Sequence, residues 1–185
     1  MFMKAPAVDY VRPRSLAEAV DLLAKRPGEA RVIAGGQSLV AMMNLRVASP
    51  GLLIDISRLP ELCSVSDDAD LVTLGACVTH AAIEDARVAD PSRGLMPRVA
   101  TTLAYRAIRN RGTIGGSLAL SDPAAEWPAV LAALDAEVWF AARPGGGRSN
   151  ARNLRPESSR QCLRPARSSK ACAFRSCRRM AAGAI

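Results

Sequence analysis

Two short glycine turns are the stretches of this sequence best suited to chemistry. The first follows the apolar run Val32-Ile33 and consists of Ala34, Gly35, Gly36, Gln37, Ser38 and Leu39. The second comprises Gly112, Thr113, Ile114, Gly115, Gly116 and Ser117. Glycine accepts backbone angles closed to other residues and leaves the main chain accessible. Because successive free N–H groups bind anions, the pair of turns predicts a site that grips the diphosphate of a dinucleotide.

The two turns together carry this hypothesis. Neither matches G-x-G-x-x-G, and no G-x-x-x-x-G-K-[ST] occurs in the chain. A single glycine turn is more often a tight bend between a strand and a helix. The elements around each turn must therefore bring them to one place.

The first turn is expected within a small β-α-β unit, residues 1–57. Ser15 and Glu18 have the spacing of a capping box, which predicts a helix start. The elements expected in order are an extended segment 8–13, that helix, a buried strand 31–34, a short helix 39–45 and a strand 52–56.

The second turn is expected in a unit spanning residues 58–142. Two strands, 62–65 and 71–74, are expected around the acidic turn 66–70, followed by helices from Thr79 to about residue 87 and over 95–107, and a strand 137–141. Asp122 before Pro123 predicts an N-cap for the helix that carries Trp127. No partner strand is expected after residue 141.

The length of the chain indicates one domain or two small ones, and its charge sets a C-terminal tail apart from the rest. Of the 185 residues, 143–185 hold eleven basic side chains and one acid, so this segment carries +10 and residues 1–142 carry −2. The tail has no apolar period and is expected to be frameshifted or, as the alternative, basic and disordered. The overall basicity does not make residues 1–142 a nucleic-acid-binding protein.

Metal and catalytic chemistry are not expected. Cys63 and Cys77 are interpreted as small buried residues, and with one histidine and no C-x-x-C neither a zinc site nor a disulfide framework is indicated. His80 is more often a packing or surface residue than a catalyst. No apolar run approaches the roughly 18 residues that span a bilayer, and no signal peptide is recognised, so a cytoplasmic location is expected.

The two turns, with the segment Ser121-Asp122-Pro123-Ala124-Ala125-Glu126, resemble the FAD-binding subunit of the molybdenum hydroxylases. The likeness covers residues 3 to about 142 and is nearest to the medium subunit of aerobic carbon monoxide dehydrogenase, with the FAD domain of xanthine dehydrogenase more distant. It implies an α+β (mixed α/β) fold: a two-lobed FAD-binding domain of the PCMH and vanillyl-alcohol-oxidase type, C-terminally truncated. The lobes are 1–57 and 58–142, the second incomplete.

The resemblance also implies which residues contact FAD. Residues 34–39 would contact the phosphates through main-chain N–H groups, and Thr113, Ile114, Gly115, Gly116 and Ser117 would contact the pyrophosphate from the other lobe. Ser117 stands where the family often has asparagine. Glu126 would lie near the ribityl or ribose hydroxyls, or else be a solvated residue of a first helical turn. Asp122 is the other candidate for this contact, but its preferred interpretation is a helix cap.

An FAD-dependent oxidoreductase subunit is the function implied. Electrons would pass from a molybdenum centre through iron–sulfur clusters to FAD and on to a quinone, NAD or oxygen. The molybdopterin-binding large subunit and the 2Fe-2S small subunit would be separate chains, in a heterotrimer or a dimer of heterotrimers. No residue of this chain is expected to be catalytic, and none to bind a metal.

Two alternatives remain open. A stand-alone flavoprotein would need its own base or a covalent flavin attachment, for which His80 and Cys63 are the remote candidates. A non-functional truncated product, or a chain that binds nucleic acid through its arginine-rich tail, is the other; Phe174 is the only aromatic residue in that tail, which argues against specific recognition.

Overall fold

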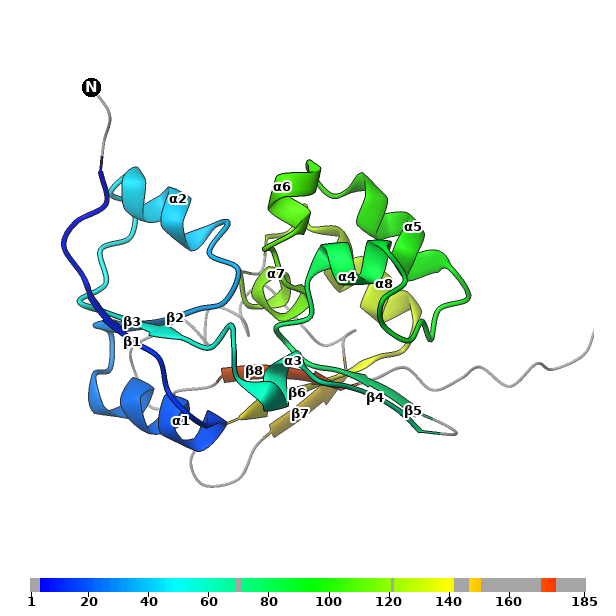
Figure 1. Cartoon of the computed structure of the whole chain (residues 1–185), viewed down its shortest axis with the longest axis horizontal. Helices are drawn as coiled ribbons and strands as arrows, with labels where there is room; N and C mark the ends of the chain where they lie inside the picture. The colour runs from blue at the N-terminus through cyan, green and yellow to red at the C-terminus, as the bar shows by residue number, and fades with distance from the viewer. Residues whose placement is uncertain (1–3, 69–70, 121, 142–146, 151–170, 176–185) are drawn as a thin grey trace, which may run out of the picture.

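Three parallel strands organise the N-terminal half of the molecule. The computed structural model describes residues 4–68, 71–120, 122–141, 147–150 and 171–175. Strands β1 (Asp9–Val11), β2 (Ala30–Ile33) and β3 (Leu52–Asp55) form a sheet in the order β1-β3-β2. Helices α1 (Leu16–Lys25) and α2 (Leu39–Asn44) lie on opposite faces of it (Figure 1). Because all three strands are parallel, the first turn leaves the sheet at the edge where β2 and β3 end.

The capping box at the start of α1 is confirmed. Ser15 Oγ accepts a hydrogen bond from the Glu18 N–H at 3.2 Å. The Glu18 carboxylate reaches back to the N–H of Arg14 at 2.6 Å, one residue beyond the usual partner. Ala19 and Val20 then face the core, so the helix starts where its apolar face meets the sheet.

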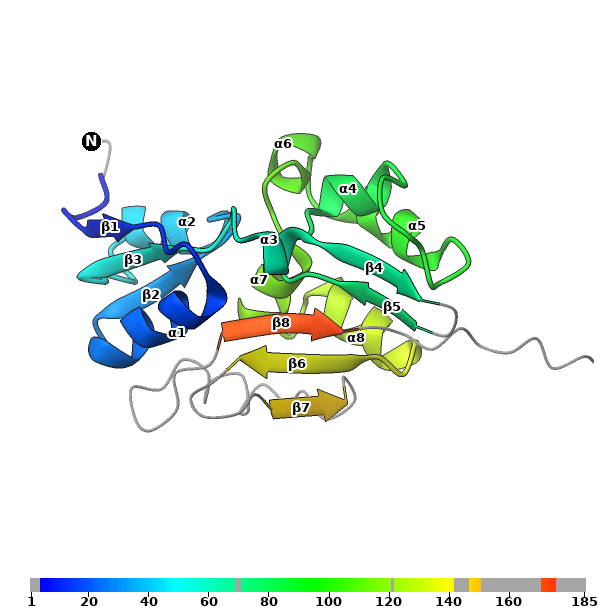
Figure 2. The ribbon, with the colours of Figure 1, turned by 60° about the horizontal axis from the view of Figure 1, so that its bottom comes forward.

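The second half places helices over antiparallel strands. Its elements are α3 (Pro60–Cys63), β4 (Val65–Asp68), β5 (Leu71–Leu74), α4 (His80–Glu84), α5 (Leu95–Thr102), α6 (Arg106–Arg109), α7 (Ile114–Leu120), α8 (Glu126–Ala133), β6 (Glu137–Ala141), β7 (Gly147–Asn150) and β8 (Ala171–Arg175). β4 pairs with β5, and β6 lies between β7 and β8. β8 runs beside β5, and helices α4 to α8 lie on one side of these strands (Figures 1 and 2).

Each half has its own core. In the first, Ile54 is fully buried together with Leu62, which α3 contributes from the second half. In the second, Trp127, Leu131 and Ile114 are fully buried between the helices and the strands. Complete burial of one such side chain contributes about 1.5–3 kcal/mol to folding, so these residues fix where α7 and α8 sit.

Several boundaries predicted from the sequence are wrong. Residues 62–65 were expected as a strand, but Pro60 starts a helical turn that buries Leu62, and β4 begins at Val65. The helix expected over 95–107 divides into α5 and α6 because Ala104 adopts a positive φ of 41°. Likewise α4 stops at Glu84, just before Ala86 at φ 52°. Left-handed residues end helices, and no glycine marks these two in the sequence.

Asp122 does not cap a helix. Its carboxylate accepts from the Ala124 N–H at 2.9 Å, and its carbonyl accepts from the Ala125 N–H at 3.0 Å. These bonds close a turn before α8, which begins at Glu126. The preferred helix-cap interpretation of Asp122 is therefore wrong: a short polar side chain here caps its own turn.

The expectation that β6 lacks a partner strand is also wrong. β7 pairs antiparallel with β6, with Phe140 opposite Gly147, and β8 pairs on its other side, with Val138 opposite Phe174. Strand pairing uses main-chain groups, so it does not require the apolar period that the sequence lacks here. The rest of the tail lies outside the described residues. Among the helices that are described, none is long and apolar enough to cross a bilayer.

Candidate functional site

The two glycine turns meet at Gly35. A Cβ atom added there would lie 2.1 Å from the Arg111 carbonyl oxygen and 2.9 Å from the Cα of Gly112, where the second turn begins. Only a residue without a side chain permits so close an approach. We call this contact between residue 35 and residues 111–112 the glycine seam. The fold thus brings together the two turns that the sequence singles out.

The first turn presents main-chain N–H groups without partners. Helical bonding in α2 begins with Val40 N–H to Gly36 O at 3.0 Å, and Gly36 itself adopts φ +73°. Within the part of the chain that the structure describes, the N–H groups of residues 35–39 have no acceptor. The Gln37 side chain donates to Gly35 O at 3.0 Å and braces the turn. Free N–H groups in succession form an anion-binding surface.

The second turn is built differently. It follows α6 rather than a strand, and it forms the start of α7. The N–H groups of residues 114–117 donate in order to Val78 O (3.0 Å), Ala76 O (2.9 Å), Thr113 Oγ1 (3.1 Å) and Thr113 O (3.0 Å). These N–H groups therefore hold the turn in place. Gly116 is exposed, and the half-buried Ser117 hydroxyl has no partner among the described residues.

His80 supports the second turn from below. Its N–H donates to Gly112 O at 2.9 Å, and a Cβ at residue 112 would come within 2.9 Å of the imidazole Nε2. Trp127 Nε1 donates to His80 Nδ1 at 3.1 Å with the two rings stacked. Since Nδ1 accepts, the proton is on Nε2 and the ring is neutral. Burial, and secondly the charge of Arg109, lower the pKa of His80 to about 4, so the expected packing role is confirmed.

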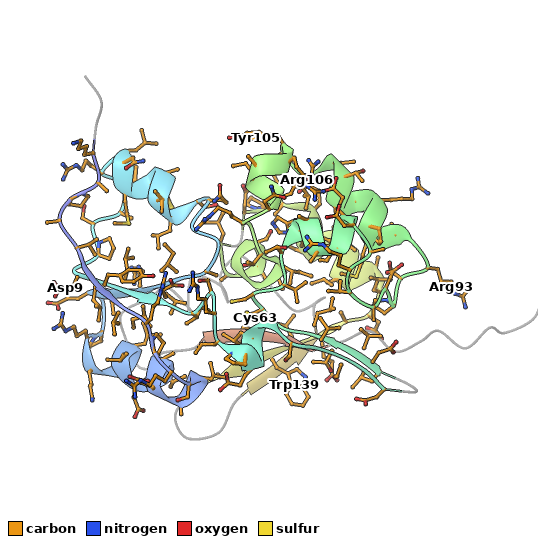
Figure 3. All side chains as sticks on the ribbon, in the orientation of Figure 1. Asp9, Cys63, Arg93, Tyr105, Arg106 and Trp139 are labelled. Carbon is orange, nitrogen blue, oxygen red and sulfur yellow. The ribbon has the colours of Figure 1, made fainter. Side chains whose placement is uncertain are left out.

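Two arginines before the second turn have structural partners. Arg109 forms a bidentate pair with Glu84 at 2.7 and 3.0 Å and also donates to the Leu103 and Ala104 carbonyls. Arg106, which is labelled in Figure 3, bridges Glu84 and Asp85. These bonds tie α6 to α4. Arg111, in contrast, is exposed and has no ion pair within the described ranges.

A polar cluster at the end of β3 was not predicted. The Tyr10 hydroxyl donates to Asp55, and Arg12 Nε lies 2.7 Å from the Tyr10 oxygen and 3.1 Å from Asp55 Oδ2. Burial alone would raise the pKa of Asp55, but hydrogen bonds from Ser57, Tyr10 and Arg12 outweigh it and lower the pKa to about 2. The cluster fastens β1 to the edge from which the first turn leaves. The signal in the sequence that could have indicated this cluster is Asp55, a charged residue at the end of a buried strand.

Glu126 stands apart from these contacts. It is the first residue of α8, its side chain is exposed, and it makes no hydrogen bond or ion pair with any described residue. No cluster of three or more His, Cys, Asp or Glu side chains suited to a metal occurs in the segments the structure describes.

Comparison with known proteins identifies the family. Residues 6–167 match the model of the FAD binding domain in molybdopterin dehydrogenase. This chain belongs to that family. The match continues past residue 142, where the resemblance seen in the sequence was expected to stop.

Relatives with known roles support the assignment. The chain is 44% identical over 136 residues to the alpha subunit of the 6-hydroxypseudooxynicotine dehydrogenase complex of Paenarthrobacter nicotinovorans, covering 74% of this chain and 46% of the relative. It is 37% identical over 134 residues to the carbon monoxide dehydrogenase medium chain of Hydrogenophaga pseudoflava, covering 72% and 47%. The chain therefore spans about half the length of these curated relatives.

Solved structures show the same fold. Carbon monoxide dehydrogenase from Hydrogenophaga pseudoflava superposes with a TM-score of 0.84 at 30% identity, covering 98% of this chain and 62% of that one. Quinoline 2-oxidoreductase from Pseudomonas putida 86 gives 0.82 at 32% identity, covering 97% and 61%. The mixed α/β FAD-binding fold is confirmed, FAD is the cofactor of the family, and the family's members are oxidoreductase subunits.

Proposed function

We propose that this chain binds the diphosphate of FAD at the glycine seam and serves as the electron-transfer flavin subunit of a molybdenum hydroxylase. In this proposal residues 34–39 contact the phosphates from one side, and residues 113–117 line the other. Glu126 binds ribityl or ribose hydroxyls. The carrying observation is the contact of Gly35 with the main chain of Arg111 and Gly112.

The first turn fits an anionic group. Its N–H groups at residues 35–39 are unpartnered within the described part of the chain, and successive free N–H groups bind anions. On the second turn, the Ser117 hydroxyl is free among the described residues to donate. Because residues 114–117 use their N–H groups internally, we assign the diphosphate mainly to the first turn, with Ser117 supplying a side-chain contact.

Bound FAD would supply the transfer of electrons. The residues of the chain bind and orient the cofactor. His80 does not support the stand-alone flavoenzyme alternative, because its ring is buried and its Nδ1 accepts a hydrogen bond from Trp127. The nucleic-acid alternative rests on a tail that is mostly outside the described residues.

Flavin binding can be tested directly on the full chain. FAD added to the purified protein should co-elute with it and show a shifted visible spectrum. No retention would refute binding by this form of the protein.

Two variants localise the site. Ser117→Ala removes one hydrogen bond to a charged group and should weaken FAD binding about tenfold or more. Ser66→Ala, at an exposed position of β4, is the matched control and should bind as the wild type does. Equal affinities of the two variants for FAD would show that Ser117 does not contact the cofactor.

Partner chains form the other half of the proposal. A tagged full-length chain should co-purify, in a host that expresses the neighbouring genes, with a molybdopterin-binding chain and a 2Fe-2S chain. The iron–sulfur clusters would be recognised from their visible absorption. A chain that purifies alone beside expressed candidates would contradict this assembly.

A further inference from the structure

Two cysteines lie near each other just after the three-stranded parallel sheet ends. Cys63 ends α3, and Cys77 lies between β5 and α4 (Figure 3 labels Cys63 on α3). The Cys63 thiol donates to Ser57 O at 3.3 Å, and the Cys77 thiol donates to Ile56 O at 3.4 Å. Both sulfurs therefore approach consecutive carbonyls of one segment.

Main-chain and thiol bonds keep the two residues near each other. Cys77 N–H donates to Leu62 O at 2.8 Å, and Leu62 is the neighbour of Cys63. The Ser57 and Ile56 carbonyls that accept from the two thiols are consecutive. The thiols of Cys63 and Cys77 also interact with each other, and a disulfide requires their Cα atoms to come within about 7 Å.

The pair differs in access. Cys77 is buried, as the sequence predicted, whereas the prediction that Cys63 is also buried is wrong, because Cys63 is exposed. Burial raises the pKa of the Cys63 thiol, an effect that its interaction with Cys77 reduces, and burial raises the pKa of Cys77 to about 12. Cys63 is therefore the thiol that an oxidant meets first, and its reaction should be slow at neutral pH.

We propose that Cys63 and Cys77 form a reversible disulfide site, oxidised by low-molecular-weight disulfides such as glutathione disulfide. The Cys63 thiolate attacks one sulfur of glutathione disulfide, and one glutathione leaves as its thiolate. Cys77, after losing its proton to that thiolate, attacks the Cys63 sulfur and releases the second glutathione. Two protein thiols are oxidised to one disulfide, and one glutathione disulfide is reduced to two thiols. This site is independent of flavin binding.

Oxidation would tie α3 to the segment that holds the second turn. Ala76 O and Val78 O, on either side of Cys77, accept from Gly115 and Ile114. A disulfide at Cys77 would therefore restrain residues 76–78, whose carbonyls hold the start of α7. The oxidised chain should resist thermal unfolding better than the reduced chain.

Mass spectrometry of the full chain tests the site. Residues 59–86 contain neither Lys nor Arg, so one tryptic peptide, 59–87, carries both cysteines and none of the tail cysteines. After incubation with glutathione disulfide this peptide should be lighter by two hydrogen atoms, and dithiothreitol should restore it. Below the pKa of Cys63 the rate should rise about tenfold per pH unit, because the thiolate is the attacking species.

Two serine variants give the controls. Cys77→Ser should stop at a glutathione adduct on Cys63, and Cys63→Ser should leave Cys77 unmodified. In the wild type, a persistent glutathione adduct on Cys63 with no internal bond, or no modification of either residue, would overturn the proposal.

Discussion

Gly35 lies against Arg111 so closely that the carbonyl oxygen of Arg111 occupies the space a side chain at position 35 would need, 2.1 Å from the missing Cβ. Gly35→Ala must push the two turns apart, which overpacks the seam and should cost about 1–3 kcal/mol of unfolding free energy. FAD retention should fall with it. Urea denaturation and a flavin titration measure the two effects.

Gly51→Ala is the matched control for that substitution. A Cβ at Gly51 would meet only the Glu29 Cβ, at 3.9 Å, so its effect should stay within about 0.5 kcal/mol. Similar losses in the two variants would show that the seam tolerates a methyl group.

The buried His80 should make stability depend on pH. Its pKa is about 4 in the folded chain against an ordinary 6.5, so between these values the unfolded chain binds a proton that the native chain does not. Stability is therefore lost as pH falls from about 6.5 to about 4, by on the order of 3 kcal/mol. Urea denaturation at pH 7 and pH 5 should show the loss, and His80→Gln should reduce it.

The same residue can be followed directly. His80 is the single histidine of the chain, so its imidazole signals in an NMR titration need no separation from others. They should not shift above pH 5. A midpoint near 6.5 would contradict the buried pairing with Trp127.

Asp55 makes stability depend on pH in a more acidic range than His80 does. Because its pKa is lowered from 3.8 to about 2, its stabilising effect is complete above pH 4 and disappears as pH falls toward 2. Asp55→Asn should therefore be less stable than the wild type at pH 6, and the two curves should converge in acid. Denaturation midpoints across pH 2–6 would measure this, and a constant difference would exclude the cluster as its source.

Arg109 should matter more than Arg106 to the position of α6. The Arg109 side chain is 12% exposed and carries two backbone contacts besides Glu84, whereas the Arg106 side chain is 47% exposed. Arg109→Ala leaves the Leu103 and Ala104 carbonyls without their side-chain donor and leaves Glu84 with Arg106 alone. The melting temperature of Arg109→Ala should therefore fall further than that of Arg106→Ala. A larger fall in melting temperature for Arg106→Ala would show instead that Arg106 holds α6 in place.

Local signals predicted the elements that depend on local chemistry. Ser15 and Glu18 mark the start of α1, and the strand expected over 137–141 matches β6. The residue types of the two glycine turns mark them in the sequence, without showing that they lie side by side. The seam itself was not derivable, because the contact of Gly35 with Arg111 depends on how the two halves pack.

Contacts between distant residues were missed for a physical reason. The hydrogen bond from Trp127 to His80 joins positions 47 residues apart. Neither residue type indicates from the sequence which partner it has. β7 was missed because strand pairing through main-chain groups leaves no trace in the side-chain pattern. Asp122 was misassigned because its side chain satisfies the same kind of N–H group in a turn as in a helix cap.

The stacking of Trp127 on His80 gives the second turn an optical reporter of its own. The chain has one other tryptophan, Trp139 on β6, so Trp139→Phe leaves a single indole, fully shielded from water beneath Gly112 and His80. Its fluorescence would respond when the imidazole ionises or when a quenching ligand such as a flavin approaches. Events at the turn can thus be followed by light emission without attaching a dye.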